Sequence, residues 1–252
     1  MPFADMLSLF VLAASPAVGS FIGVVVDRTE RREGFVSGRS RCDHCGAVLG
    51  VRDLVPLLSW LAAGGRSRCC GRPLRTFLPA VEGAAVAVAL WSVLAAWGPV
   101  GALTAVLGWW LLALALIDLR EYRLPDAGTL PLLAAGLAVS AAGLTGPLWA
   151  HLLGAVLGYA SLAGLAYAYR RLRGIDGLGL GDAKLLAAGG AWAGAAALPS
   201  ILLWAGLSGL AAAATLALAG RPMGAQTALP FGPGLALGLF LTWTLGPLVF
   251  AG

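Results

Sequence analysis

Runs of about 20 apolar residues recur along this 252-residue chain, and they restrict the folds that it can adopt. A helix of that length crosses the roughly 30 Å hydrocarbon core of a bilayer. Only 12% of the residues are charged, whereas soluble domains carry about 25%. We therefore expect an all-α polytopic membrane protein with about eight transmembrane helices. Their predicted ranges are 6–26, 78–97, 99–118, 128–146, 149–169, 183–196, 198–219 and 231–250.

The sixth predicted span, 183–196, is short and rich in glycine. Seven spans with one re-entrant segment are therefore the alternative to eight crossings. Apart from these apolar runs the chain has one long polar stretch, 28–76, and its sequence shows no internal repeat.

The arginines and lysines give the chain an orientation, because basic residues concentrate in cytosolic connections. Ten of the 17 lie between Arg28 and Arg75. The only early charge is Asp5, so we interpret the first span as a retained anchor rather than a cleaved signal peptide. We expect an outside N-terminus and a small cytosolic domain between the first two spans. The predicted cytosolic connections are 28–76, 119–127, 170–182 and 220–230.

The formal net charge of +5 does not indicate a nucleic-acid partner. The basic segment is short, contains acidic residues and adjoins membrane spans, so we interpret its arginines as determinants of topology. We expect the protein to contact a lipid bilayer and not to bind nucleic acid.

All four cysteines lie in the polar stretch, as Cys42-x-x-Cys45 and the adjacent pair Cys69 and Cys70. Two cysteine pairs separated by a loop of this length are typical of a structural zinc site. The side chains of adjacent residues such as Cys69 and Cys70 tend to diverge, however, so both would bind one ion only through an unusual turn. Three interpretations stay open: zinc held by four thiolates, zinc held by three cysteines with His44 or water, and no metal. A cytosolic location disfavours disulfides. A metal here would stabilise a segment with few apolar residues.

Two aspartates occupy the cytosolic ends of predicted spans. Acids at membrane depth are costly and are therefore candidates for function. Asp118 ends an apolar run, where it could simply pair with Arg120 or Arg123. Asp182 follows glycines at 177, 179 and 181, where it could simply cap the next helix.

Both aspartates are expected at one depth, which favours a joint role. Two carboxylates held close together do not both ionise easily, so one keeps a proton while the other acts as a base. Such a pair activates water and protonates the leaving group, as in aspartic peptidases. Further along, Pro230 and Gly232 interrupt regular helix at the start of the last span, which is tolerated at membrane depth beside a cavity or another chain.

These residues resemble a known family, the type IV prepilin peptidases, which are bacterial inner-membrane aspartic peptidases of the GxGD class. The resemblance runs in order through most of the chain. It is carried by Gly19-Ser-Phe-Ile-Gly23, Cys42-x-x-Cys45, Val55-Pro-Leu-Leu-Ser-Trp60, Pro79-Ala-Val-Glu82, Asp118-Leu-Arg120, Gly179-Leu-Gly-Asp182-Ala-Lys184 and Pro230-Phe-Gly-Pro233.

The resemblance implies cleavage of the basic leader of type IV prepilins or type II secretion pseudopilins. The cut would follow a glycine at the cytosolic membrane face, with Asp118 and Asp182 as the catalytic pair. It also implies methylation of the new N-terminus from S-adenosylmethionine by the other half of the protein. Substrate binding is assigned to five residues: Gly179, Gly181, Lys184, Pro230 and Gly232.

The expected domains are a first transmembrane helix (1–27), a cytosolic cysteine-containing domain associated with methylation (28–76) and a transmembrane peptidase domain (77–252). The expected metal ligands are Cys42, Cys45, Cys69 and Cys70. The chain departs from the family pattern at Ser67, where the second C-x-x-C would place a thiol, and at Gly23, where an asparagine is frequent. A peptidase without methyltransferase activity is therefore one alternative. An ion-coupled transporter is the other, because acids also line ion pathways.

Overall fold

The computed structural model describes residues 2–31, 40–42, 44–174, 179–220 and 229–248. These residues are helical apart from turns, loops and two isolated antiparallel bridges, Arg41 with Val48 and Arg66 with Pro73. The all-helical class expected from the sequence is confirmed. The chain forms two compact units, Met1–Trp109 and Trp110–Gly252, which we call the first and second unit.

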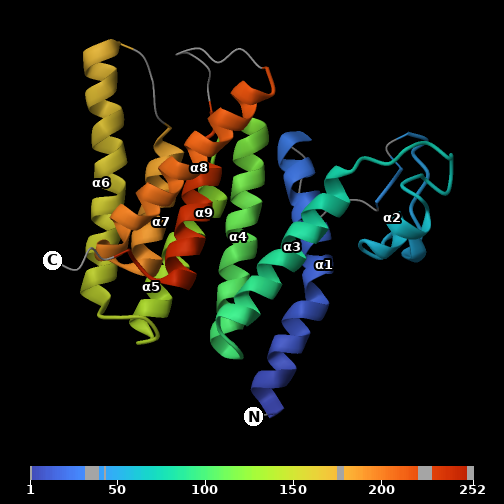
Figure 1. The fold of residues 1–252 in the computed structure, drawn as a ribbon, viewed down its shortest axis with the longest axis horizontal. Helices are drawn as coiled ribbons and strands as arrows, with labels where there is room; N and C mark the ends of the chain where they lie inside the picture. Colours follow the sequence, from blue (N-terminus) through green and yellow to red (C-terminus); the bar gives the residue numbers. More distant parts are fainter. Residues whose placement is uncertain (1, 32–39, 43, 175–178, 221–228, 249–252) are drawn as a thin grey trace. The chain divides into compact units, whose positions relative to one another are not determined.

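Among the described residues, an α-helix occupies most of each predicted span (Figure 1). Their bounds are α1 (Pro2–Arg31), η1 (Val51–Asp53), α2 (Leu58–Ala62), α3 (Phe77–Ala95), α4 (Pro99–Glu121), α5 (Asp126–Ala141), α6 (Leu148–Arg173), α7 (Leu180–Ala193), η2 (Ala195–Ala197), α8 (Leu198–Leu218) and α9 (Gly232–Leu245). The unit boundary falls inside α4, so this helix contributes its first half to one unit and its second half to the other.

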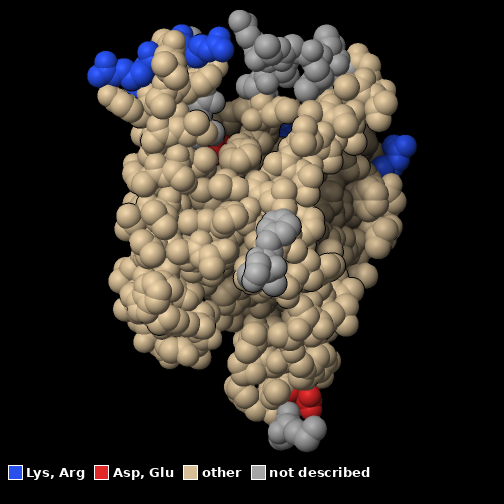
Figure 2. Space-filling view, turned by 60° about the vertical axis from the view of Figure 1, so that its left-hand side comes forward, with Lys and Arg blue, Asp and Glu red and all other residues tan. Residues whose placement is uncertain are grey.

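Five helices of the described chain are long and apolar enough to cross a membrane: Phe3–Glu30, Phe77–Ala95, Pro99–Glu121, Leu148–Arg173 and Ala195–Leu218. Helices α5 and α9 are apolar but shorter. The protein is therefore a multi-pass membrane protein, while the count of eight crossings stays a prediction. In Figure 2, most of the face in view lacks Lys, Arg, Asp and Glu, as expected for a surface in contact with lipid.

In the first unit, α1 packs against α3. The contact is close because Gly19 of α1 lies over Glu82, where an added Cβ would come 2.6 Å from the Glu82 Cα. Small residues that let helix backbones approach are typical of helix contacts in membranes, where burial of apolar surface gives no advantage over lipid.

In the second unit, α7 is the central helix and contacts α5, α6, α8 and α9 (Figure 1). Most of its side chains are buried, from Ala183 to Trp192. A helix that is apolar on all sides is stable only inside a larger structure. The short, glycine-rich segment noted in the sequence is thus surrounded by the other helices of its unit.

Helices α6 and α7 touch along their backbones. A Cβ added at Gly158 would lie 2.6 Å from the Leu186 carbonyl oxygen, and one added at Gly190 would lie 2.1 Å from the Gly154 oxygen. Side chains with polar atoms add direct links to α7: the Trp192 indole N–H donates to the Leu132 carbonyl (2.8 Å), and His151 Nδ1 donates to the Ala191 carbonyl (3.0 Å). Backbone contact and these bonds fix the position of α7.

We expect Gly158→Val to destabilise the protein by about 1–3 kcal/mol, because the added methyl groups meet backbone atoms that cannot move aside. The measurement is thermal unfolding in detergent. Gly164→Val is the matched control on the same helix, because nothing lies within 4 Å of a Cβ there. Equal loss of stability in the two variants would contradict the packing described for α6 and α7.

Candidate active site

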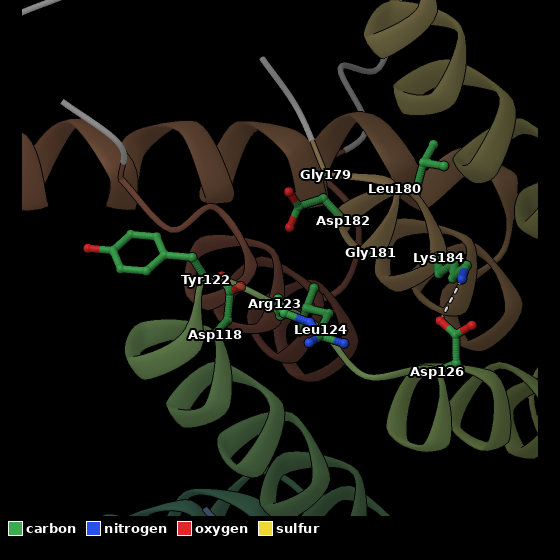
Figure 3. A pocket seen from close by; sticks show the side chains of 10 residues that line it. All are labelled: Asp118, Tyr122, Arg123, Leu124, Asp126, Gly179, Leu180, Gly181, Asp182 and Lys184. Carbon is green, nitrogen blue, oxygen red and sulfur yellow. Dashed lines mark hydrogen bonds and ion pairs between the residues drawn. The ribbon is translucent and has the colours of Figure 1, made fainter. Parts of the chain in front are cut away.

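A pocket of about 270 Å³ lies in the second unit where α4, α5 and α7 come together (Figure 3). Its walls come from the end of α4, the loop to α5, and the first turn of α7. The lining residues are Asp118, Tyr122, Arg123, Leu124, Asp126, Gly179, Leu180, Gly181, Asp182 and Lys184. Both predicted catalytic aspartates therefore line one pocket.

Asp118 lies in the last turn of α4 and is 5% exposed. The negative end of a helix dipole is an unfavourable place for a carboxylate. The Gly232 backbone N–H, at the first residue of α9, donates to Asp118 Oδ2 at 3.0 Å. Because the N-terminal N–H groups of a helix favour an anion, α9 offsets the cost of burying this carboxylate.

Gly232 fits this place because it has no side chain. A Cβ at position 232 would lie 2.6 Å from Asp118 Oδ2 and 2.9 Å from its Cγ. The sequence predicted that Gly232 would contact substrate, whereas the structure places it against the aspartate. Pro230 precedes the start of α9 and is not among the residues that line the pocket.

Asp182 is the third residue of α7 and is partly buried. The helix begins after Gly179, which occupies the N-cap position with no side-chain hydrogen bond. Asp182 is therefore not the cap of its helix, which was the alternative to a chemical role. Figure 3 shows its carboxylate turned into the pocket, toward the side occupied by Asp118.

The two pocket glycines differ in their surroundings. At Gly181 a Cβ would lie 2.9 Å from the Leu124 Cβ, so the chain itself uses the missing side chain to bring α7 against the loop after α4. At Gly179 the nearest atom to an added Cβ is Asp182 Oδ2 at 3.6 Å, which leaves room. Gly177 lies outside the described residues.

Lys184 pairs with Asp126 at the edge of the pocket. The ion pair joins the first turn of α7 to the first residue of α5 (Figure 3). Asp126 lies within the predicted connection 119–127, but no feature of the sequence indicates that it pairs with a residue 58 positions away. The loop residues Tyr122, Arg123 and Leu124 were likewise not identified as pocket residues.

The four cysteines form a second site, in the first unit. Their Sγ atoms all lie within 4.8 Å of one another; Cys42 and Cys70 are 3.8 Å apart, and Cys45 and Cys69 are 3.2 Å apart. Cys69 and Cys70 therefore both reach the cluster, although neighbouring side chains tend to diverge. Both follow Ser67 in a tight turn that closes with Gly71 at a φ of +69°, and this turn brings both thiols to one place.

Two turns of the same construction hold these cysteines. In the first, Gly46 N–H donates to the Cys42 carbonyl and Cys42 N–H donates to the Ala47 carbonyl. In the second, Gly71 N–H donates to the Ser67 carbonyl and Ser67 N–H donates to the Arg72 carbonyl. Position 67 thus corresponds to Cys42, position 70 to Cys45, and Cys69 is the additional thiol. The structure reveals a short repeat that the sequence alone did not show.

Hydrogen bonds give these thiols unequal acidity. The Ser67 hydroxyl lies 3.4 Å from Cys42 Sγ and, together with backbone N–H groups, lowers the pKa of Cys42 to about 5. For Cys45, the Ala47 backbone lowers the pKa, but the neighbouring Cys69 thiol and burial outweigh it and raise the pKa to about 11. Thiolates are the form that binds metal, so at neutral pH the cluster already holds one charged ligand.

Comparisons with known proteins cover both sites. Residues 14–97 match the family described as Bacterial Peptidase A24 N-terminal domain, and residues 105–214 match the Type IV leader peptidase family. A prepilin leader peptidase/N-methyltransferase of Burkholderia pseudomallei is 40% identical over 91% of this chain and 82% of its own length. The chain belongs to the prepilin leader peptidase/N-methyltransferase family.

Other members are similarly close. The protein of that name from Dickeya chrysanthemi is 39% identical over 94% of this chain and 91% of its own length. The protein of that name from Stutzerimonas stutzeri is 34% identical over 94% of this chain and 89% of its own length. No solved structure matched the chain. The resemblance seen in the sequence is confirmed at the level of the family.

Each of the two family matches contains one of the two sites described above. The thiol cluster and Glu82 lie within the N-terminal match, and Asp118 and Asp182 lie within the leader peptidase match. Gly232 lies beyond residue 214, so its contact with Asp118 is visible only in the structure. Similarly, the tertiary structure alone shows that Lys184 and Asp126 form a pair.

We expect Gly232→Ala to lower the peptidase activity of this family member on the order of a hundredfold, because the added methyl group displaces the Asp118 carboxylate. The fall should appear in kcat rather than KM, since Gly232 contacts the aspartate. Cleavage rates of a prepilin in detergent give both constants. Gly209→Ala is the control, because its Cβ would meet open space. An unchanged kcat in Gly232→Ala would show that this contact does not position Asp118.

Proposed function

We propose that the protein removes the basic leader from type IV prepilins or pseudopilins, after a glycine at the cytosolic membrane face, and methylates the new N-terminus. By homology at about 40% identity over most of its length, the chain is a prepilin leader peptidase and N-methyltransferase. The observation that carries the peptidase mechanism is the pair of aspartates, Asp118 and Asp182, in one pocket.

We assign the base to Asp118, because the Gly232 N–H stabilises its negative charge. Asp118 takes a proton from water, whose oxygen attacks the scissile carbonyl carbon, while a protonated Asp182 gives its proton to the carbonyl oxygen. In the second step the carbon–nitrogen bond breaks. The leaving amine receives the proton from Asp118, and the proton on the former carbonyl oxygen returns to Asp182.

The surroundings of the pair fit an extended peptide. Gly179 leaves room at the pocket wall, so a substrate backbone can lie against the enzyme backbone there. We assign Lys184 an indirect role, because its pair with Asp126 holds the first turn of α7 against α5 and thereby positions Asp182. Gly181 has the same kind of role through Leu124.

We propose that the protein lies in the inner membrane of a bacterium. The distribution of basic residues in the sequence places the N-terminus outside and the cysteine domain in the cytosol. Both aspartates occupy ends of apolar helices, where water is at hand, rather than the middle of a span. This placement favours hydrolysis over ion transport. We also propose the division expected from the sequence: a first transmembrane helix (1–27), a cytosolic cysteine-containing domain (28–76) and a transmembrane peptidase domain (77–252).

We expect Asp118→Asn and Asp182→Asn each to lower the cleavage rate more than about a hundredfold, because each removes one half of the proton transfer. Mass spectrometry of a purified prepilin, incubated with and without S-adenosylmethionine, detects loss of the leader and gain of a methyl group. Asp5→Asn is the control, since Asp5 lies in the first unit and accepts a bond from Trp97. Near-normal turnover in both pocket variants would rule out the dyad. Cleavage without methylation by the unaltered protein would favour the peptidase-only alternative.

We propose that the cysteine cluster binds zinc. Four thiolates about 2.3 Å from a zinc ion stand about 3.8 Å apart at the corners of a tetrahedron, which agrees with the Sγ separations described above. His44 is a poor ligand here because its Nε2 lies 3.1 Å from the Pro73 carbonyl. We therefore favour the four-thiolate set over the set that includes His44. Bound zinc would hold the two turns together.

We expect the purified protein to contain close to one zinc ion per chain and Cys70→Ser to lose most of it, because a hydroxyl is a poor substitute for a thiolate. Elemental analysis by mass spectrometry gives the ratio. In His44→Ala the zinc content should be unchanged. Zinc lost in His44→Ala but kept in Cys70→Ser would instead identify the histidine as a ligand.

A further inference from the structure

Five apolar side chains between the two cysteine turns have no core to pack into. Neither η1 nor α2 contains a buried residue. We call these five residues the apolar ledge; their exposed fractions are Val51 82%, Leu54 48%, Val55 40%, Leu58 65% and Leu61 64%. Single exposed apolar residues are ordinary, but five within eleven consecutive residues indicate a surface that something else covers.

A buried carboxylate fixes the position of the apolar ledge. Glu82 is 4% exposed, and its Oε2 accepts a hydrogen bond from the Leu57 N–H at 2.8 Å. Leu57 has a φ of +58°, and the Leu58 N–H donates to the Pro56 carbonyl, so this residue is the centre of a strained γ-turn. The bond to Glu82 offsets the strain and ties the turn to α3.

Glu82 also sets the depth of the ledge. It is the sixth residue of α3, about 7.5 Å along the axis from Phe77 at 1.5 Å per residue. Helix α3 is one of the helices that are long and apolar enough to cross a membrane. In Figure 1, α2 lies at the level of the first half of α3 rather than beyond its start. The ledge is therefore at the height where α3 enters lipid, which is the depth of interfacial helices.

The charges around the ledge complement an anionic surface. Residues 40–76 contain six arginines and two aspartates. All six arginines are exposed in the structure: Arg41, Arg52, Arg66, Arg68, Arg72 and Arg75. Asp53 is paired with Arg68 at 3.8 Å. Apolar side chains flanked by arginines are typical of protein segments that lie in the headgroup region of anionic membranes.

We propose that the apolar ledge inserts into the headgroup region of an anionic bilayer, so that the cysteine domain lies on the membrane beside α3. The lipid covers the side chains that the small domain cannot bury. Exposed arginines contact lipid phosphates, and the Glu82–Leu57 bond holds the segment at the depth where both contacts form. The proposal does not depend on the catalytic mechanism.

The test uses the full-length protein in nanodiscs, with an encoded fluorescent amino acid at Val51 or at Leu58. The lipid is phosphatidylcholine alone or an equal mixture with phosphatidylglycerol, each with a small fraction of lipid carrying a nitroxide near the headgroup. A probe at Ala47, exposed in the first cysteine turn, is the matched control. We expect the nitroxide to quench the ledge probes about twofold or more, more strongly with phosphatidylglycerol, and to leave the control nearly unquenched.

Three results would overturn the proposal. Equal quenching at Ala47 would mean that the ledge has no special contact with lipid. Quenching independent of phosphatidylglycerol would remove the role of anionic lipid. If the ledge probes were shielded from an aqueous quencher but not quenched by the nitroxide, protein rather than lipid would cover the ledge. Comparing discs that hold one copy with discs that hold two would show whether the covering protein is a second molecule of this chain. Two ledge positions guard against a single probe that disturbs the fold.

Discussion

The backbone contact between α6 and α7 is the constraint on which the second unit depends. Because Gly154, Gly158 and Gly190 have no side chains, the two helices approach until carbonyl groups and Cα atoms touch. Helix α7 can then be buried on all sides although it has only 14 residues. Its first turn is thereby fixed at the end of α4, where Asp182 faces the pocket that also contains Asp118.

The buried carboxylate of Asp118 is hydrogen-bonded from an element far along the chain. The first N–H of α9 reaches its carboxylate over 114 positions of sequence, and Gly232 leaves space for no other atom. A carboxylate bonded in this way is held in one orientation. The same bond favours its charged form, which is the form that a base requires. In the mechanism proposed above, the orientation of the base therefore depends on a single glycine.

In the first unit, residues 40–76 must be stabilised in another way, because they contain too few buried side chains to form a core. Among the described residues of this stretch, only Cys42 and Ser67 are fully buried. Two hydrogen-bonded turns bring four thiols together, and the buried Glu82 attaches the connecting segment to α3. A metal ion and a lipid surface would supply the stabilisation that apolar burial supplies in larger domains.

The sequence by itself determined the helical class, the approximate helix positions, the family and the placement of Asp118 and Asp182 at helix ends, because long apolar runs and short motifs are local features. It did not reveal the Gly232 contact, the pairing of Lys184 with Asp126, or the convergence of Cys69 and Cys70. It also left open whether Asp182 caps its helix. These depend on backbone turns and on contacts between residues distant in sequence, which no local pattern encodes. Only the tertiary structure decided them, because helix packing sets which atoms meet.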